Sequence, residues 1–231
     1  MRGLNPRHEL GVIAALTFAS LTACDRQVTT KGECRPVPGA AVCAFSKTMG
    51  GELASFGATV PIAAIESAPA DAPMVRPPVA SAEIPMPEIV RMTWGVHVLT
   101  IYWEAHGHPP APFMVPHFDF HFDNAMLDEV KAIDCTDTAK PATPPNSYAL
   151  ADTVAFEKSM VIGYYHQKPI FFEPMIARAT LLERRSFELR VPYVAGVPTA
   201  VRYPTQFRAR YDSTAQSYTF EFANWGRPAP K

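Results

Sequence analysis

The chain has 231 residues, with 21 basic and 22 acidic side chains and a net charge of -1. This balance, with only 19% charged residues, lacks the basic face that phosphate binding requires, so we expect no nucleic-acid partner. The hydrophobic share of 48% excludes a largely disordered chain. Proline occurs 24 times against 12 glycines, which favours a β-rich domain with few long helices.

The N-terminus predicts a lipoprotein signal peptide over residues 1–23. Arg2 and Arg7 precede an uncharged run over 10–21, which has the length of a secretory signal. The run ends in Leu-Thr-Ala before Cys24, which resembles the bacterial lipobox, whose cysteine is acylated. The prediction is therefore export to the periplasmic side of the cell envelope, with a lipid anchor as the membrane contact. The choice between inner and outer membrane stays open, and the alternative is ordinary cleavage elsewhere.

Export sets an oxidising environment for the three remaining cysteines. Cys34 and Cys43 flank Pro36, Pro38 and Gly39, which can fold the chain back and bring the two thiols together. We therefore prefer a Cys34–Cys43 disulfide over a bond from either residue to Cys135.

The rest of the chain predicts a tether and one domain. Residues 24–40 are expected to be the tether, and 41–231 a single β-rich domain. A Gly-Gly turn favours a hairpin of strands 41–47 and 53–65. The proline-rich stretch 66–87 is expected to be an extended surface loop.

Residues 88–104 are rich in β-branched and aromatic side chains and predict one or two strands. Asn124 is expected to cap a short helix. The remaining expected elements are a strand over 117–123, hairpins of 160–166 with 169–173 and of 207–211 with 218–222, and a helix or strand within 175–185. This pattern predicts a mainly β fold, an antiparallel barrel or sandwich with one or two short helices.

Five of the seven histidines fall in one window of the sequence, and they are His97, His106, His108, His117 and His121. Successive side chains of a strand point to opposite faces, so the histidines and aspartates of 117–123 share one face and its three phenylalanines share the other. The aromatic face predicts core. The polar face then either meets solvent or lines a metal or acid/base site.

The distance between residues along the strand limits which of these side chains can bind one ion together. At about 3.3 Å per residue, His117 and His121 stand roughly 13 Å apart, so Asp119 with one neighbour is the expected chelating pair. His106 and His108 form a second expected pair. Imidazole and carboxylate ligands admit zinc, iron, manganese, nickel or copper as the divalent ion.

Glu173 follows three apolar residues, and a carboxylate so placed is rarely buried without a partner. It is a candidate metal ligand or catalytic general base; the alternative is an exposed acid at a strand end. His97 is expected to be structural, and the role of His166 stays open.

Three motifs together carry a family resemblance. They are His-Gly-His-Pro-Pro (106–110), Pro-His-Phe-Asp-Phe-His-Phe (116–122) and Phe-x-Glu-Pro-Met (171–175). In this order they resemble the Thermus TTHB-like domain family, whose members are often exported or lipid-anchored. The resemblance spans 41–222, but this chain lacks the Met-Gly-x-His-Trp stretch that relatives have between the second and third motifs. It implies no known reaction, since the family's function is unknown.

The first hypothesis is an exported lipoprotein that binds a divalent transition metal. The second is a metal-dependent enzyme of isomerase, oxygenase or hydrolase type on the same frame, which would also bind a small-molecule ligand. The third is a structural or interaction lipoprotein whose histidines form a solvated face.

Overall fold

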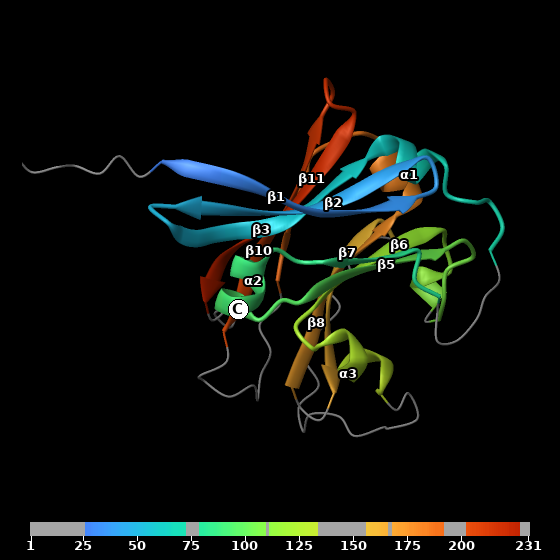
Figure 1. The fold of residues 1–231 in the computed structure, drawn as a ribbon. Helices are drawn as coiled ribbons and strands as arrows, with labels where there is room; N and C mark the ends of the chain where they lie inside the picture. The colour runs from blue at the N-terminus through green and yellow to red at the C-terminus, as the bar shows by residue number, and fades with distance from the viewer. Residues whose placement is uncertain are drawn as a thin grey trace, which may run out of the picture.

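The computed structural model describes residues 26–72, 79–109, 111–133, 156–165, 168–191 and 202–226. Within these ranges the chain folds into two antiparallel sheets that pack face to face, with four short α-helices around them (Figure 1). The two sheets are separate and open at their edges, so the mainly β fold is confirmed as a sandwich rather than a barrel.

The six-stranded sheet contains both ends of the described chain. Its β2–β3 turn is the predicted one, because Gly50 and Gly51 both take a positive φ, which tight hairpins need. The strand order is β1 (Gln27–Val37), β2 (Ala40–Met49), β3 (Glu52–Pro61), β11 (Ser217–Gly226), β10 (Tyr203–Asp212) and β9 (Phe187–Arg190).

The five-stranded sheet carries the histidine-rich strand at its centre. The strand order is β4 (Ala82–Pro85), β5 (Val98–Glu104), β6 (His117–Asp123), β8 (Lys168–Ala177) and β7 (Lys158–Tyr165). Because β6 is flanked on both sides, its position and register are fixed by two sets of hydrogen bonds.

The core between the sheets is aromatic. The three phenylalanines of β6 point into it, as the alternation predicts, and Phe120 meets Phe220 of β11 with ring centroids 4.9 Å apart. Phe222 of β11 contacts Phe56, Phe122 and Phe207 at 5.0 to 5.5 Å. These contacts lock the inner face of β6 and thereby set which side chains point outward.

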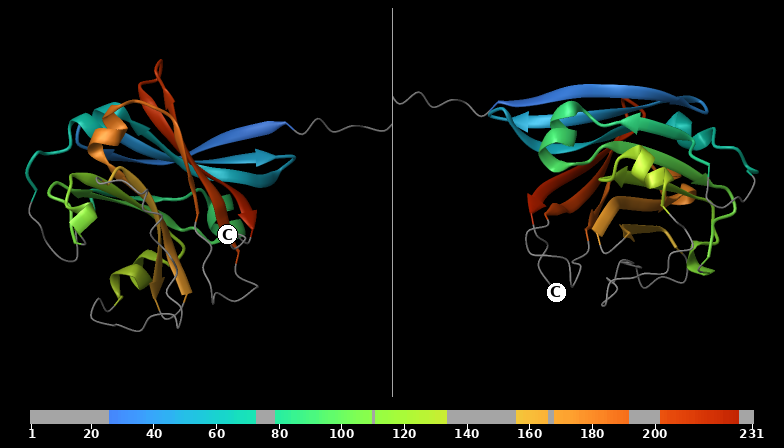
Figure 2. Two further views of the ribbon diagram at one scale, coloured as in Figure 1. Left: turned by 180° about the vertical axis from the view of Figure 1, so that it is seen from behind. Right: turned by 60° about the horizontal axis from the view of Figure 1, so that its bottom comes forward.

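The helices are short and lie at the ends of the sheets (Figures 1 and 2). Among the described residues, no helix has the length and apolar character needed to cross a membrane. The helices are α1 (Ile62–Glu66), α2 (Glu88–Trp94), α3 (Leu127–Lys131) and α4 (Arg178–Leu182), and a 3-10 turn, η1 (Ala111–Phe113), precedes β6.

Several expected boundaries move. Residues 27–37, expected in a tether, form β1, and β4 lies inside the expected proline-rich loop. The first half of 88–104 is α2 rather than a strand, because Pro87 precedes it and Gly95 takes the left-handed conformation that ends a helix. Residue 126 rather than Asn124 caps α3.

The disulfide joins Cys34 of β1 to Cys43 of β2, as the sequence predicts. The two residues are register partners across the β1–β2 hairpin. The bond therefore links two residues that are nine positions apart in the sequence, and it ties the edge strand β1 to the sheet. Cys24 and Cys135 lie outside the described residues.

We expect Phe222→Ala to lower the free energy of unfolding by about 3–5 kcal/mol, because it removes a fully buried ring that contacts both sheets. Urea unfolding of the oxidised protein measures this. Met92→Ala is the matched control, since Met92 is 80% exposed and should cost under about 0.5 kcal/mol. Equal losses for the two variants would contradict the proposed position of the core.

Candidate metal centre

The outer face of β6 is buried, although it points away from the core between the sheets. His117, Asp119 and Asp123 are 0%, 4% and 0% exposed. The hypothesis of a solvated histidine face is therefore wrong for these side chains. Buried carboxylates need partners, so the groups around this face must supply them.

The chain between β5 and β6 folds back over this face and covers it. Gly107 takes a positive φ, and a Cβ at this position would collide with the carbonyl oxygen of Phe113. The backbone N–H of His108 donates to that same carbonyl at 3.1 Å. Phe113 then packs edge-on against Phe156, whose ring also meets His117. This second apolar cluster shields the polar face from water.

Three side chains converge at the start of β6. His117 Nε2 lies 3.2 Å from Asp119 Oδ1, and His108 Nε2 lies 3.7 Å from Asp119 Oδ2. The two imidazole rings meet edge-on with centroids 4.9 Å apart. One ligand atom from each of the three residues falls within 4.8 Å of the others, so the group can hold a metal ion.

Both imidazoles of this group are oriented by the backbone. His117 Nδ1 lies 2.7 Å from the carbonyl oxygen of Val115, and His108 Nδ1 lies 2.8 Å from that of Pro109. A carbonyl only accepts, so each Nδ1 donates and each Nε2 is left facing Asp119. His117 Nε2 and Asp119 Oδ1 are both buried without a hydrogen-bond partner. The two atoms therefore lie close to each other, and neither is satisfied by a hydrogen bond.

A second group shares Asp119. The β6–β8 register pairs Asp119 with Met175, which places Glu173 beside His121, and His121 Nε2 lies 3.4 Å from Glu173 Oε1. Asp119, His121 and Glu173 again offer ligand atoms within 4.8 Å of one another.

Aromatic rings fix the orientation of His121. Its ring stacks on Phe171 with centroids 4.1 Å apart and meets the edge of Tyr102 at 4.8 Å. Burial opposes protonation of His121, but the negative charges of Glu173 and Asp123 outweigh it and raise its pKa to about 9. The imidazole of His121 thus lies among negatively charged carboxylates.

The other carboxylates reflect the same balance of burial and charge. Burial opposes ionisation of Asp119, but His108 and His117 outweigh it and hold the pKa of Asp119 well below its usual value. Burial raises the pKa of Asp123 to about 6, even though its Oδ2 accepts a 2.8 Å hydrogen bond from Thr100. In the part of the chain that the structure describes, the ion pairs of Asp119 and Glu173 are with imidazoles.

No family model, curated protein or solved structure matches the chain. The resemblance to the Thermus TTHB-like domain family therefore stays a prediction. The interpretation of the site rests on its own geometry.

The structure brings together most, but not all, of the expected ligands. His108, His117, Asp119, His121 and Glu173 meet on one face. The expected pair of His106 with His108 does not form. His106 has a half-exposed side chain and contacts Asp71 at 2.9 Å, because the turn at Gly107 separates the two histidines.

Other candidates fall elsewhere. His97 belongs to neither group, and His166 lies outside the described residues. Thr100 and Tyr102 of β5, which were not among the expected site residues, contact Asp123 and His121. Their alternate spacing on the neighbouring strand is the signal that would have found them, because β5 pairs Thr100 with His121 and Tyr102 with Asp119.

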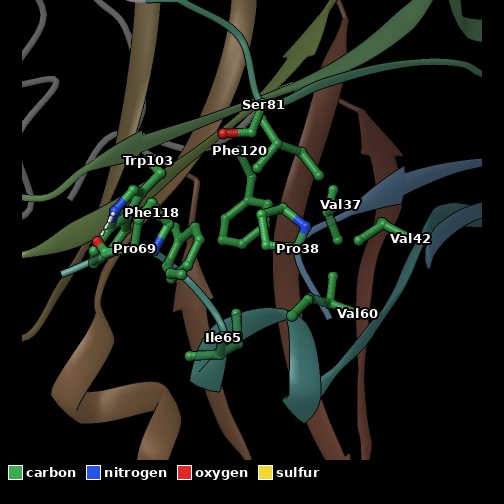
Figure 3. A pocket seen from close by; sticks show the side chains of 13 residues that line it. Val37, Pro38, Val42, Val60, Ile65, Pro69, Ser81, Trp103, Phe118 and Phe120 are labelled. Carbon is green, nitrogen blue, oxygen red and sulfur yellow. Dashed lines mark hydrogen bonds between the residues drawn. The ribbon is translucent and has the colours of Figure 1, made fainter. Parts of the chain in front are cut away.

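An apolar pocket lies on the opposite side of β6, between the two sheets (Figure 3). Phe118 and Phe120 line it, and α1 contributes Ile65. At its rim, the indole N–H of Trp103 donates to the carbonyl oxygen of Pro69 at 2.8 Å. The pocket offers no imidazole or carboxylate among its lining residues, so it is separate from the metal centre.

We expect neutral His117 to carry its proton on Nδ1, because that atom lies 2.7 Å from the Val115 carbonyl oxygen. Long-range ¹H–¹⁵N correlation spectra of the metal-free full chain distinguish the two tautomers. His106, which is half exposed, serves as the internal comparison. A neutral His117 protonated at Nε2 would contradict the orientation described above.

Proposed function

We propose that this chain is an exported, lipid-anchored envelope protein that binds a divalent transition metal ion through His108, His117 and Asp119. The observation that carries the proposal is that His117 Nε2 and Asp119 Oδ1 are both buried and neither has a hydrogen-bond partner. They lie 3.2 Å apart and share no hydrogen bond. A cation between them would satisfy both.

The spacing of the ligand atoms supports a metal ion. Two ligands on a tetrahedral zinc ion at bond lengths of about 2.0–2.1 Å lie about 3.3–3.4 Å apart. The separations of Asp119 from His117 and His108, 3.2 and 3.7 Å, bracket this value. The ligands thus need only small shifts to bind an ion.

The backbone contacts of the imidazoles give a second line of support. Metal-binding histidines usually donate their other ring N–H to a carbonyl or carboxylate, which fixes the tautomer and ring orientation. Val115 and Pro109 supply such carbonyls to His117 and His108. Two imidazoles and one carboxylate suit zinc and iron(II) best, and they also admit manganese, nickel and copper.

Export rests on the sequence and on the disulfide. Residues 1–23 have the order of a lipoprotein signal, ending before Cys24. A disulfide between Cys34 and Cys43 is what an oxidising compartment permits and a reducing one opposes. These observations support a protein held at the membrane surface by acyl chains rather than by a helix.

Replacing His108 and His117 together with Ala should remove one equivalent of bound zinc from the full chain. Loss of a residue that merely hydrogen-bonds to a metal ligand lowers metal affinity about 10–100-fold. The double variant loses two of the three ligands themselves, so we expect a larger fall in zinc affinity at this site. Equilibrium dialysis of the chelator-stripped, tag-free protein, followed by elemental analysis, measures this.

His106→Ala is the matched control, because this histidine lies in the same loop outside both ligand groups. It should leave zinc stoichiometry unchanged. A folded double variant that retains all the zinc of the wild type would overturn the site, as would a wild-type chain that binds none.

The lipid anchor has a separate test. The full chain should fractionate with membranes, and Cys24→Ser should lose acylation, because serine has no thiol to accept the lipid. Mass spectrometry of the N-terminal peptide and membrane fractionation check both effects. Cys135→Ser is the matched control and should stay acylated. A mature N-terminus at another residue would refute the anchor and leave the metal site untouched.

A further inference from the structure

We propose that the site holds two divalent ions, with Asp119 as the shared ligand between them. The second ion would be bound by Asp119, His121 and Glu173, the group that lies one strand repeat further along β6. This inference rests on the proposed function, because the first ion occupies the His108, His117 and Asp119 group.

The pleat of β6 generates the two groups as a continuous row. His117, Asp119 and His121 follow one another at two-residue spacing on the same face, so a carboxylate stands between two imidazoles. His108 adds to one end of the row from the loop, and Glu173 adds to the other end from β8. Each half then has its own histidine from β6 and its own additional ligand.

The ligand separation at the second group lies between the two separations of the first. His121 Nε2 and Glu173 Oε1 lie 3.4 Å apart, the separation expected for two ligands on one tetrahedral ion. Asp119 has one oxygen near each neighbouring histidine of the first group, and its ligand atoms also fall within 4.8 Å of those of the second. A carboxylate shared in this way is how two-metal sites keep their ions about 3.5–4 Å apart.

The second group contains a buried carboxylate of its own. Asp119, Asp123 and Glu173 are 4%, 0% and 5% exposed. Among the described residues, the ion pairs that Asp119 and Glu173 make are with histidines and none is with lysine or arginine. Carboxylates and imidazoles arranged in this way are ligands that a divalent transition metal ion accepts.

A buried oxygen without a hydrogen-bond partner also lies beside the second group of ligands. Asp123 is fully buried, and its Oδ1 has no hydrogen-bond partner, while its Oδ2 is bonded to Thr100. Asp123 follows His121 on the same face of β6, so its unpartnered oxygen contributes negative charge beside the second group. The rings of Phe171 and Tyr102 pack against the imidazole of His121.

The test is the zinc stoichiometry of the chelator-stripped, tag-free full chain, read by elemental analysis after dialysis. We expect two equivalents in the wild type and one in Glu173→Gln, which keeps the shape of the side chain but removes its charge. Glu221→Gln is the matched control, because Glu221 is also a buried strand glutamate but lies on β11 of the six-stranded sheet, where it pairs with Lys47. It should keep two equivalents.

Electron paramagnetic resonance of the copper(II)-loaded protein gives a second readout. Two ions that share Asp119 should produce a dipolar-coupled spectrum in the wild type and a single-ion spectrum in Glu173→Gln. An uncoupled wild-type spectrum at two equivalents would overturn the shared ligand, even if a variant fails to fold.

The outcomes separate the two proposals. One equivalent in the wild type, lost when His108 and His117 are replaced, overturns the second ion and leaves the proposed function standing. Two equivalents that survive Glu173→Gln overturn the assignment of the second ion to Asp119, His121 and Glu173. No bound zinc in the folded wild type overturns both.

Discussion

The alternation of side chains along β6 is the constraint on which the rest of the structure depends. Phe120 and Phe122 pack against aromatic rings of the opposite sheet, and Phe118 is buried in the same core, so the strand cannot slip by one residue without exposing all three. Because the inner face is fixed, His117, Asp119, His121 and Asp123 are fixed on the outer face. The aromatic core therefore positions the polar cluster on the other side of the same strand.

Burying this polar face is unfavourable unless its groups are satisfied, and the fold satisfies them only in part. Backbone carbonyls hold the Nδ1 atoms of His108 and His117, and Thr100 bonds one oxygen of Asp123. On this face His117 Nε2 and Asp119 Oδ1, which lie 3.2 Å apart, have no hydrogen-bond partner, and neither has Asp123 Oδ1. A protein that covers such a face with Phe113 and Phe156 retains a cost that a bound cation would offset.

The proposed location and the proposed site are physically consistent. An envelope protein meets metal ions outside the cytoplasm, where thiolate ligands tend to be oxidised. The two cysteines of the described chain form a disulfide, and the ligand groups contain only imidazoles and carboxylates. Such ligands do not depend on a reducing environment. The β1–β2 disulfide lies in the other sheet, so it stabilises an edge strand without contributing to the site.

Local turn geometry and the period of a strand were enough to predict the mainly β class, three hairpins, the Cys34–Cys43 pair and the two faces of 117–123. The helix at 88–94 could not be predicted in this way, since capping and packing outweigh local β propensity there. The same is true of the separation of His106 from the cluster, because one residue in the left-handed conformation reverses the chain. The meeting of Glu173 with His121 depends on a strand register between residues 52 positions apart, which no local pattern encodes.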